Sequence, residues 1–155
     1  MAVYFLYFTE RGSSIPIDRA FADQVIGTMF EHRQVIINPN ADHEIVDRFP
    51  MVLSTFEQAR QHPWLKSLRW VLMHPRAKML LQEYGHPEDD VIYCIGSDRD
   101  GFGVEPGGID ADFLRLNVGP DEESKTKEFH AAVVLPAVAY DRALKLWQKR
   151  HLAKQ

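Results

Sequence analysis

Short apolar runs rich in Val, Ile, Tyr and Phe are the feature that most limits what this chain can fold into. Such runs, bounded by turn residues, are typical of β-strands in a packed sheet. Five of them occur, at residues 3–8, 34–37, 91–95, 113–118 and 129–135. The Asp100-Gly101 pair after the third run predicts a hairpin turn, from which residues 102–105 would return as a further strand.

Between these runs, apolar residues recur at the spacing of three or four positions that is typical of helices. Asp18 is placed to cap a helix that reaches about Phe30, and residues 42–84 are expected to be mostly helical. Within that stretch, the His62-Pro63 and His74-Pro75 pairs predict two short helices that begin at their prolines. Proline is tolerated there because the first position of a helix has no intrahelical partner for its N–H.

The C-terminal stretch from Ala137 to about Leu152 predicts an amphipathic helix. We expect Val138, Leu144 and Trp147 to face inward, together with Leu152, and the basic residues to face solvent. Because the strand-like runs and the helical stretches are grouped rather than strictly alternating, the order favours an α+β fold. We therefore expect one domain over residues 1–155, with a mainly antiparallel sheet, a helical middle segment and a C-terminal helix.

Charge is strongly segregated along the 155 residues, although the net charge is only −4. Residues 1–87 carry nine acidic and nine basic side chains. Residues 88–123 carry eleven acidic side chains against two basic ones, and residues 124–155 carry seven basic side chains against two acidic ones. An acidic stretch of this kind attracts basic partners and speeds their association. The overall balance disfavours nucleic acid as a partner, because nucleic-acid-binding domains are usually basic.

Other classes of protein are disfavoured by what the sequence lacks. No apolar run approaches the 18 to 20 residues of a membrane span, and the N-terminal run has no basic segment before it. With Cys94 as the single cysteine and no export signal, we expect a cytoplasmic protein with a buried, inert thiol. Neither the histidine spacing nor the glycine-rich segments match a metal or phosphate motif, so we expect no metal and no cofactor.

The sequence hypothesis is a small protein-binding or inhibitory protein, similar in physical type to bacterial immunity or antitoxin proteins or phage inhibitors. The protein would present an acidic, loop-rich surface to a basic protein partner. We expect it to have no enzymatic activity of its own. Phe102 would be an apolar anchor at the hairpin tip. The proposed partner-binding residues are Asp98, Asp100, Phe102, Glu105, Asp110 and Asp112.

Two alternatives remain open at this point. The first is a metal-dependent hydrolase, in which Asp110 and Asp112 share one strand face and act with a histidine. The second is a structural subunit of a larger assembly that docks through the C-terminal helix and Trp147. The oligomeric state is left open by the sequence.

Overall fold

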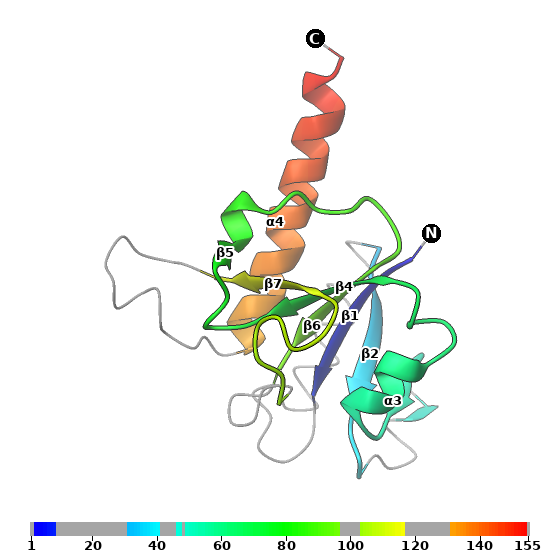
Figure 1. Cartoon of the computed structure of the whole chain (residues 1–155). Coiled ribbons are helices and arrows are strands. Elements are labelled where there is room, and N and C mark those ends of the chain that lie inside the picture. The colour runs from blue at the N-terminus through cyan, green and yellow to red at the C-terminus, as the bar shows by residue number, and fades with distance from the viewer. Residues whose placement is uncertain are drawn as a thin grey trace.

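The structure is a computed structural model, and it shows a single seven-stranded sheet with helices on both faces (Figure 1). It describes residues 2–8, 31–40, 46–47, 49–96, 103–116 and 131–154, the first three residues of the last range by their backbone alone. The strands are β1 (Val3–Phe8), β2 (Arg33–Ile37), β3 (Val52–Leu53), β4 (Arg69–Met73), β5 (Met79–Leu80), β6 (Val91–Ile95) and β7 (Asp112–Arg115). The helices are α3 (Phe56–Gln61), the 3₁₀ helix η1 (Leu81–Glu83) and α4 (Ala131–Leu152).

The strand order is β3-β2-β1-β6-β4-β7-β5, and every pairing between described strands is parallel. Strand β6 is central, because Cys94 lies opposite Leu6 of β1 on one side and opposite Leu72 of β4 on the other. All five residues of β6 are buried, as are five of the six residues of β1. A strand covered on both faces has no polar side, so its sequence is continuously apolar rather than alternating.

The expectation of a mainly antiparallel α+β sheet was therefore wrong, and the fold is α/β with an all-parallel sheet among the described strands. The continuous apolar runs at residues 3–8 and 91–95 are the pattern of strands buried on both faces, which is typical of parallel sheets. The grouping of elements along the chain misled the prediction because β4 was taken as helical. With β4 absent, strands and helices no longer alternate, and alternation is the usual sign of a parallel sheet.

Three strand predictions were confirmed and several helix predictions were not. Strands β1 and β6 have the expected bounds, and β2 begins one residue earlier than expected. Turns follow Pro63 and Pro75 instead of the two predicted helices, and β4 lies between them. The predicted strand at residues 129–135 was wrong, because α4 begins at Ala131 and continues through Pro136. Residues 103–105 form no strand, and the Asp18–Phe30 helix and the Asp100-Gly101 turn lie outside the described residues.

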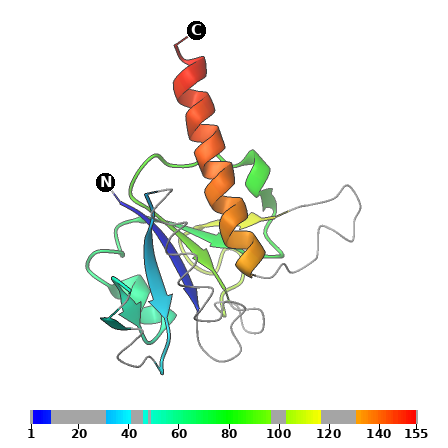
Figure 2. The same ribbon diagram turned by 180° about the vertical axis from the view of Figure 1, so that it is seen from behind.

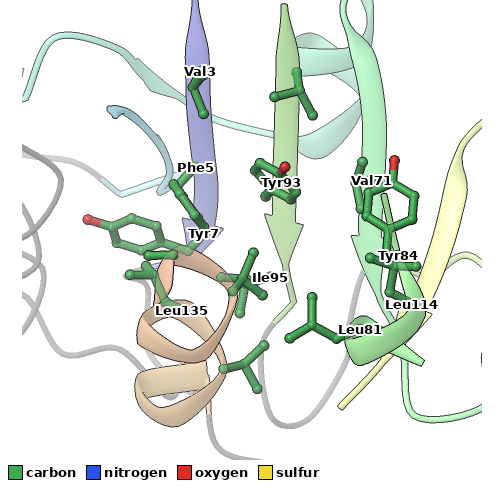
Figure 3. Packing of buried hydrophobic residues seen from close by; sticks show 14 of the residues in the cluster. Val3, Phe5, Tyr7, Val71, Leu81, Tyr84, Tyr93, Ile95, Leu114 and Leu135 are labelled. Atoms are coloured by element: carbon green, nitrogen blue, oxygen red, sulfur yellow. The ribbon is translucent and has the colours of Figure 1, made fainter. Parts of the chain in front are cut away.

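The two faces of the sheet carry separate hydrophobic clusters. Helix α4 covers one face, where Phe5, Tyr93 and Val71 of the central strands are buried with Leu135 from the first turns of the helix (Figure 3). Helix α3 and the following turn cover part of the other face, where Leu6, Leu72 and Cys94 are buried with Leu65. Cys94 is fully buried, and burial raises the pKa of its thiol, which confirms the expected inert cysteine.

Helix α4 runs antiparallel to the strands, and its C-terminal half projects beyond the sheet (Figures 1 and 2). Val138 is buried as expected, but Leu144, Trp147 and Leu152 are exposed, so their predicted inward orientation was wrong. The side of the helix that faces the protein is instead set by Arg142 and Lys145, whose side chains donate hydrogen bonds to main-chain carbonyl groups beneath the helix. None of the helices in the described part of the chain is long and apolar enough to cross a membrane.

The buried position of β4 predicts a large cost for removing its central side chain. Leu72 is fully buried, so Leu72→Ala is expected to lower the free energy of unfolding by about 2–5 kcal/mol through lost burial and the cavity left behind. Urea denaturation of both proteins measures this difference. The control is Leu152→Ala, whose side chain is mostly exposed and which should change stability by no more than about 0.5 kcal/mol. Equal effects of the two substitutions would contradict the placement of β4.

Candidate functional site

The carboxyl edge of the sheet is the candidate site, because the strand order changes direction there. The chain leaves β1 toward β2 on one side, whereas it leaves β6 toward β7 on the other side, beyond β4. In parallel α/β sheets, ligands bind in the crevice outside the carboxyl ends of two neighbouring strands whose connections depart in opposite directions. Strands β1 and β6 are such a pair, so the crevice is expected beyond Phe8 and Ile95.

Apolar side chains and main-chain groups form the described part of this edge. Ile95 of β6 lies opposite Met73 of β4, which in turn lies opposite Leu114 of β7. Met73 and Leu116 are partly buried and pack against the cluster beneath α4. Leu135 from the first turns of α4 closes the same edge beside Ile95 (Figure 3). Sites for small molecules are mostly apolar with a few main-chain polar groups, and this edge has that character.

Two connections at this edge are tied together by polar contacts. The His74 N–H donates to the Leu114 carbonyl at 2.8 Å, and the Arg76 N–H donates to Nδ1 of His74 at 3.0 Å. The Arg76 guanidinium pairs with both carboxylate oxygens of Glu105, with its Nε 3.1 Å from Oε2. This pairing holds the pKa of Glu105 below its usual value. The connection after β4 is thereby fixed to the connection after β6.

The connection after β6 needs glycine at two of its described turns. Gly103 has φ of 66° and Gly107 has φ of 86°, a region that side chains other than glycine rarely adopt. Among the described residues, and apart from the chain neighbours, no heavy atom lies within 4 Å of a Cβ placed at either glycine. The glycines therefore serve the backbone path, and the structure records no neighbouring group that demands their small size.

The residues predicted to bind a partner are not brought together as one acidic surface in the described part of the chain. Glu105 is exposed and paired with Arg76, and Asp110 is exposed. Asp112 lies at the opposite, amino end of β7, where it accepts hydrogen bonds from Arg69 and Tyr84. The remaining three, Asp98, Asp100 and Phe102, lie outside the described residues, so any role for them stays a prediction.

The Asp112 carboxylate is engaged in the fold rather than available for chemistry. Arg69 Nε lies 2.8 Å from one carboxylate oxygen, and the Tyr84 hydroxyl donates to the same oxygen at 2.6 Å. Burial raises the pKa of Asp112, but the hydrogen bonds from Arg69 and Tyr84 outweigh it and hold the pKa below its usual value. No group of three potential metal ligands occurs among the described residues. These residues therefore do not support the metal-dependent hydrolase alternative.

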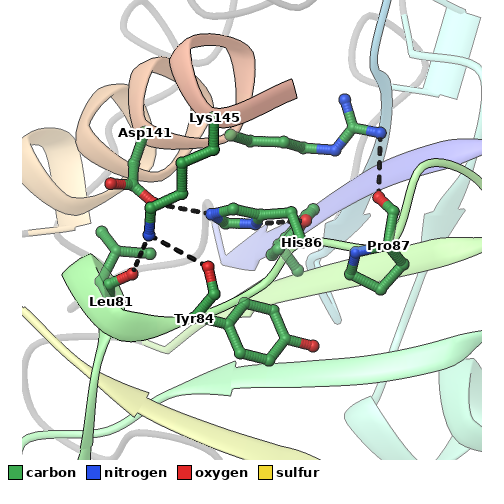
Figure 4. Close-up of polar contacts among 8 residues, drawn as sticks. Leu81, Tyr84, His86, Pro87, Asp141 and Lys145 are labelled. Atoms are coloured by element: carbon green, nitrogen blue, oxygen red, sulfur yellow. Dashed lines mark hydrogen bonds and ion pairs between the residues drawn. The ribbon is translucent and has the colours of Figure 1, made fainter. Parts of the chain in front are cut away.

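A buried polar network holds α4 on the sheet, and sequence reasoning missed it (Figure 4). His86 lies between Tyr93 of β6 and Asp141 of α4, with its two ring nitrogens 2.7 Å from the Tyr93 hydroxyl and 2.7 Å from the Asp141 carboxylate. Asp141 also pairs with Lys145 at 2.8 Å. The Lys145 ammonium donates to the carbonyl groups of Leu81 and Tyr84, at 2.8 and 3.0 Å.

This network is structural rather than catalytic. The His86 side chain is fully buried, so no substrate reaches its ring nitrogens. Burial lowers its pKa, and this effect outweighs the opposing hydrogen bond to Asp141. A neutral imidazole fits the geometry, because one nitrogen can donate to Asp141 while the other accepts from Tyr93. The sequence signal for His86 was its place before Pro87 at an element boundary, which gives no indication of a partner 55 residues away.

Comparison with known proteins gives structural matches only. No protein-family model matches the chain, and no curated protein matches it. A crystal structure of a provisionally assigned RNA methyltransferase from Bacillus anthracis matches with a TM-score of 0.67 at 10% identity, covering 93% of this chain and 94% of that one. A structure reported for the 2-OH methylation of C/U34 on tRNA matches with a TM-score of 0.65 at 14% identity, covering 94% and 91%. An AdoMet-bound rRNA methyltransferase from Sinorhizobium meliloti matches with a TM-score of 0.61 at 14% identity, covering 97% and 57%.

These matches show that the chain has the fold of the solved methyltransferase structures. They contradict the expectation of an inhibitory protein of the immunity or antitoxin type, and neither the hydrolase nor the structural-subunit alternative fits them better. They also contradict the expected basic protein partner and the exclusion of nucleic acid. The expectation against nucleic acid rested on the net charge of the whole chain, although a fold can carry its binding site in one small region of the surface.

The buried histidines predict that the fold loses stability in acid. The unfolded chain protonates its histidines below their usual pKa of 6.5, whereas burial lowers the pKa of His86 and lowers that of His32 to about 3. The unfolded state then binds more protons, so the free energy of unfolding should fall as pH drops below about 6.5, by at most about 1.4 kcal/mol per pH unit for each group.

Urea denaturation between pH 7.5 and about 5 measures this slope, the range being set by the usual histidine pKa of roughly 6.5. His86→Gln should reduce the slope, and His151→Gln, a histidine substitution on the exposed end of α4, is the matched control. An unchanged slope in His86→Gln would contradict a neutral, buried imidazole.

Proposed function

We propose that this protein is a methyltransferase that uses S-adenosylmethionine and acts on RNA. The observation that carries the proposal is the match of the whole fold to provisionally assigned and characterised RNA methyltransferase structures, over more than nine-tenths of both chains in two cases. The strand order is consistent with the proposal, because parallel sheets with such a change of direction bind ligands outside the carboxyl ends of the strands, here β1 and β6. The name of one matched structure also includes bound AdoMet, the methyl donor proposed here.

The described residues at the carboxyl edge fit a nucleoside-type donor. Met73 and Leu116 are partly buried and can supply apolar surface for a flat purine ring, whereas Ile95 belongs to the buried core beneath them. The chain at Gly96 is only half-buried, so its main-chain groups can pair with polar atoms of the donor. When bound there, S-adenosylmethionine would supply an electrophilic methyl group carried on a positively charged sulfur.

The contribution of this chain's own residues is binding and orientation. The buried strands and α4 form a rigid wall behind the edge, because the core residues there are close to fully buried. The contact between Arg76 and Glu105 holds two of the bordering connections in one arrangement. Sites of this kind gain rate by positioning the reacting groups, and small displacements are costly. Arg76 and Glu105 are therefore positioning residues in this proposal.

The function is tested by donor binding and by methyl transfer. Calorimetric titration with S-adenosylmethionine should show one saturable site, competed by the demethylated product. Incubation with methyl-labelled donor and total RNA should transfer the label to RNA. Ribonuclease should then release the label from the precipitate, and protease should not. Donor binding with label in protein instead of RNA would reject RNA as the substrate. The absence of donor binding would reject the methyltransferase assignment.

The Arg76–Glu105 contact gives a residue-level test of the site. Arg76→Ala should lower the rate of methyl transfer by up to about 100-fold, because the two connections lose their shared anchor. Thermal unfolding should change little, since both side chains are exposed. Lys78→Ala, an exposed change in the same connection, is the control. Restoration of rate in the double variant Arg76→Glu, Glu105→Arg would support a positioning role, whereas a wild-type rate in Arg76→Ala would exclude it.

A further inference from the structure

An open hollow lies away from the carboxyl edge, on the face of the sheet that carries α3. It is lined by Tyr4, Arg33, Gln34, Pro50, Met51 and Trp64 and has an empty volume of about 270 Å³. Because Tyr4 and Arg33 are paired residues near the amino ends of β1 and β2, the hollow is at the edge opposite the donor crevice. The Trp64 segment runs between α3 and β4 along that side of the sheet (Figure 1).

The side chain of Trp64 is the unusual feature of this hollow. It is 70% exposed, the highest value among the large hydrophobic residues that the structure describes. The neighbouring His62 ring meets the indole edge-on, with centroids 5.6 Å apart and planes at 74°. The main-chain N–H of Trp64 donates to Nδ1 of His62 at 3.2 Å. The indole is thus supported beside the hollow while most of its surface stays open to solvent.

The polar surroundings of the hollow favour an anionic ligand with a flat ring. Arg33 lines the hollow and is exposed, and Lys66 lies exposed in the same turn as Trp64. The acidic residues nearest in the chain are Glu31, two residues before β2, Asp47, three residues before Pro50, and Glu57, which accepts a hydrogen bond from Gln61. None of the three is among the residues that line the hollow. Proteins that bind single-stranded nucleic acids combine exposed aromatic side chains, on which bases stack, with basic side chains, which pair with phosphates. An exposed indole next to basic side chains is such a combination.

We infer that the Trp64 hollow binds one nucleotide of single-stranded RNA, with its base stacked on the indole and its phosphate paired with Arg33. This inference rests on the proposed function, because it assigns a second contact for the same RNA substrate. The contact lies on the sheet edge opposite the donor crevice, so it adds affinity and register without touching the reacting atoms.

The test uses Trp64 itself as the reporter. In a Trp147→Phe background, Trp64 is the exposed indole of the described chain, because Trp70 is buried. Titration with a short single-stranded oligouridylate should quench its fluorescence, and a duplex RNA of equal length should not. Trp64→Ala should weaken binding of the single strand by about 5- to 150-fold, the range expected for loss of one stacked base. Arg33→Ala should lower the slope of log affinity against log salt by about 0.7, the value for one phosphate on a single strand.

Controls separate this inference from the proposed function. Trp147→Ala removes an exposed indole on α4 and should leave RNA affinity unchanged. Trp64→Ala should bind S-adenosylmethionine as the wild-type protein does, because the hollow and the crevice lie at opposite edges. Wild-type RNA affinity in Trp64→Ala, with donor binding intact, would reject the hollow as an RNA-binding site and leave the methyltransferase proposal unaffected. A Trp64-dependent self-association without RNA quenching would assign the surface to protein contact and also reject the hollow as an RNA-binding site.

Discussion

Burial of β6 on both faces, between β1 and β4, is the constraint on which the rest of the structure depends. Every residue of β6 is almost fully excluded from solvent, and its neighbours on each side are parallel to it. Parallel strands of this kind require cover on both faces. Helix α4 supplies one cover, and α3 with the turn at Leu65 supplies part of the other. The position of β6 next to β1 also creates the change of direction from which a ligand crevice is expected at the carboxyl edge.

The cover from α4 depends on polar contacts as much as on apolar ones. Its apolar residues near the first turns fill the cluster beneath, but farther along the helix Arg142 and Lys145 face the body of the protein. Their partners are main-chain carbonyl groups and Asp141, which also holds His86. A buried polar group is costly unless it is paired, so each member of this network fixes the next. The result is one defined rotation of the helix about its axis.

The sequence was sufficient for strands β1, β2 and β6, but not for the other strands or for the arrangement of the sheet. Runs such as residues 91–95 combine β-branched and aromatic residues without a polar side, and their local preference agrees with their final state. Strand β4 was missed because Trp70, Val71 and Leu72 fit both a strand and one turn of a helix, and short apolar runs cannot be separated by period alone. The prediction for residues 131–135 was wrong in the opposite sense. Their composition is typical of a strand, but they form the first turns of α4, because the packing of the helix overrides local preference.

The site was harder to predict than the fold for a related reason. Acidic residues at 105 and 112 look equivalent in the sequence, yet one pairs with Arg76 in a surface connection and the other with Arg69 and Tyr84 at the opposite edge. Likewise, the partner of His86 is 55 residues away. Such contacts are set by strand order, and strand order follows from long-range pairing that no local pattern encodes. The available signal was the apolar continuity of the strands, which indicates parallel pairing and thereby the edge at which parallel α/β sheets generally bind ligands.

The late position of β6 in the chain has a consequence for how the protein is made. Strands β1 and β4 leave the ribosome before residues 91–95, and they are joined only through β6, which lies between them in the sheet. During that interval each presents an unpaired edge, which is the surface through which nascent chains aggregate. Insertion of a single strand then joins two halves of the sheet, with pairings that span up to 88 residues, from Val3 to Val91. Loop closures of this length slow folding, and the sheet is complete only when β7, which follows β6 in the chain, has also paired with β4 and β5.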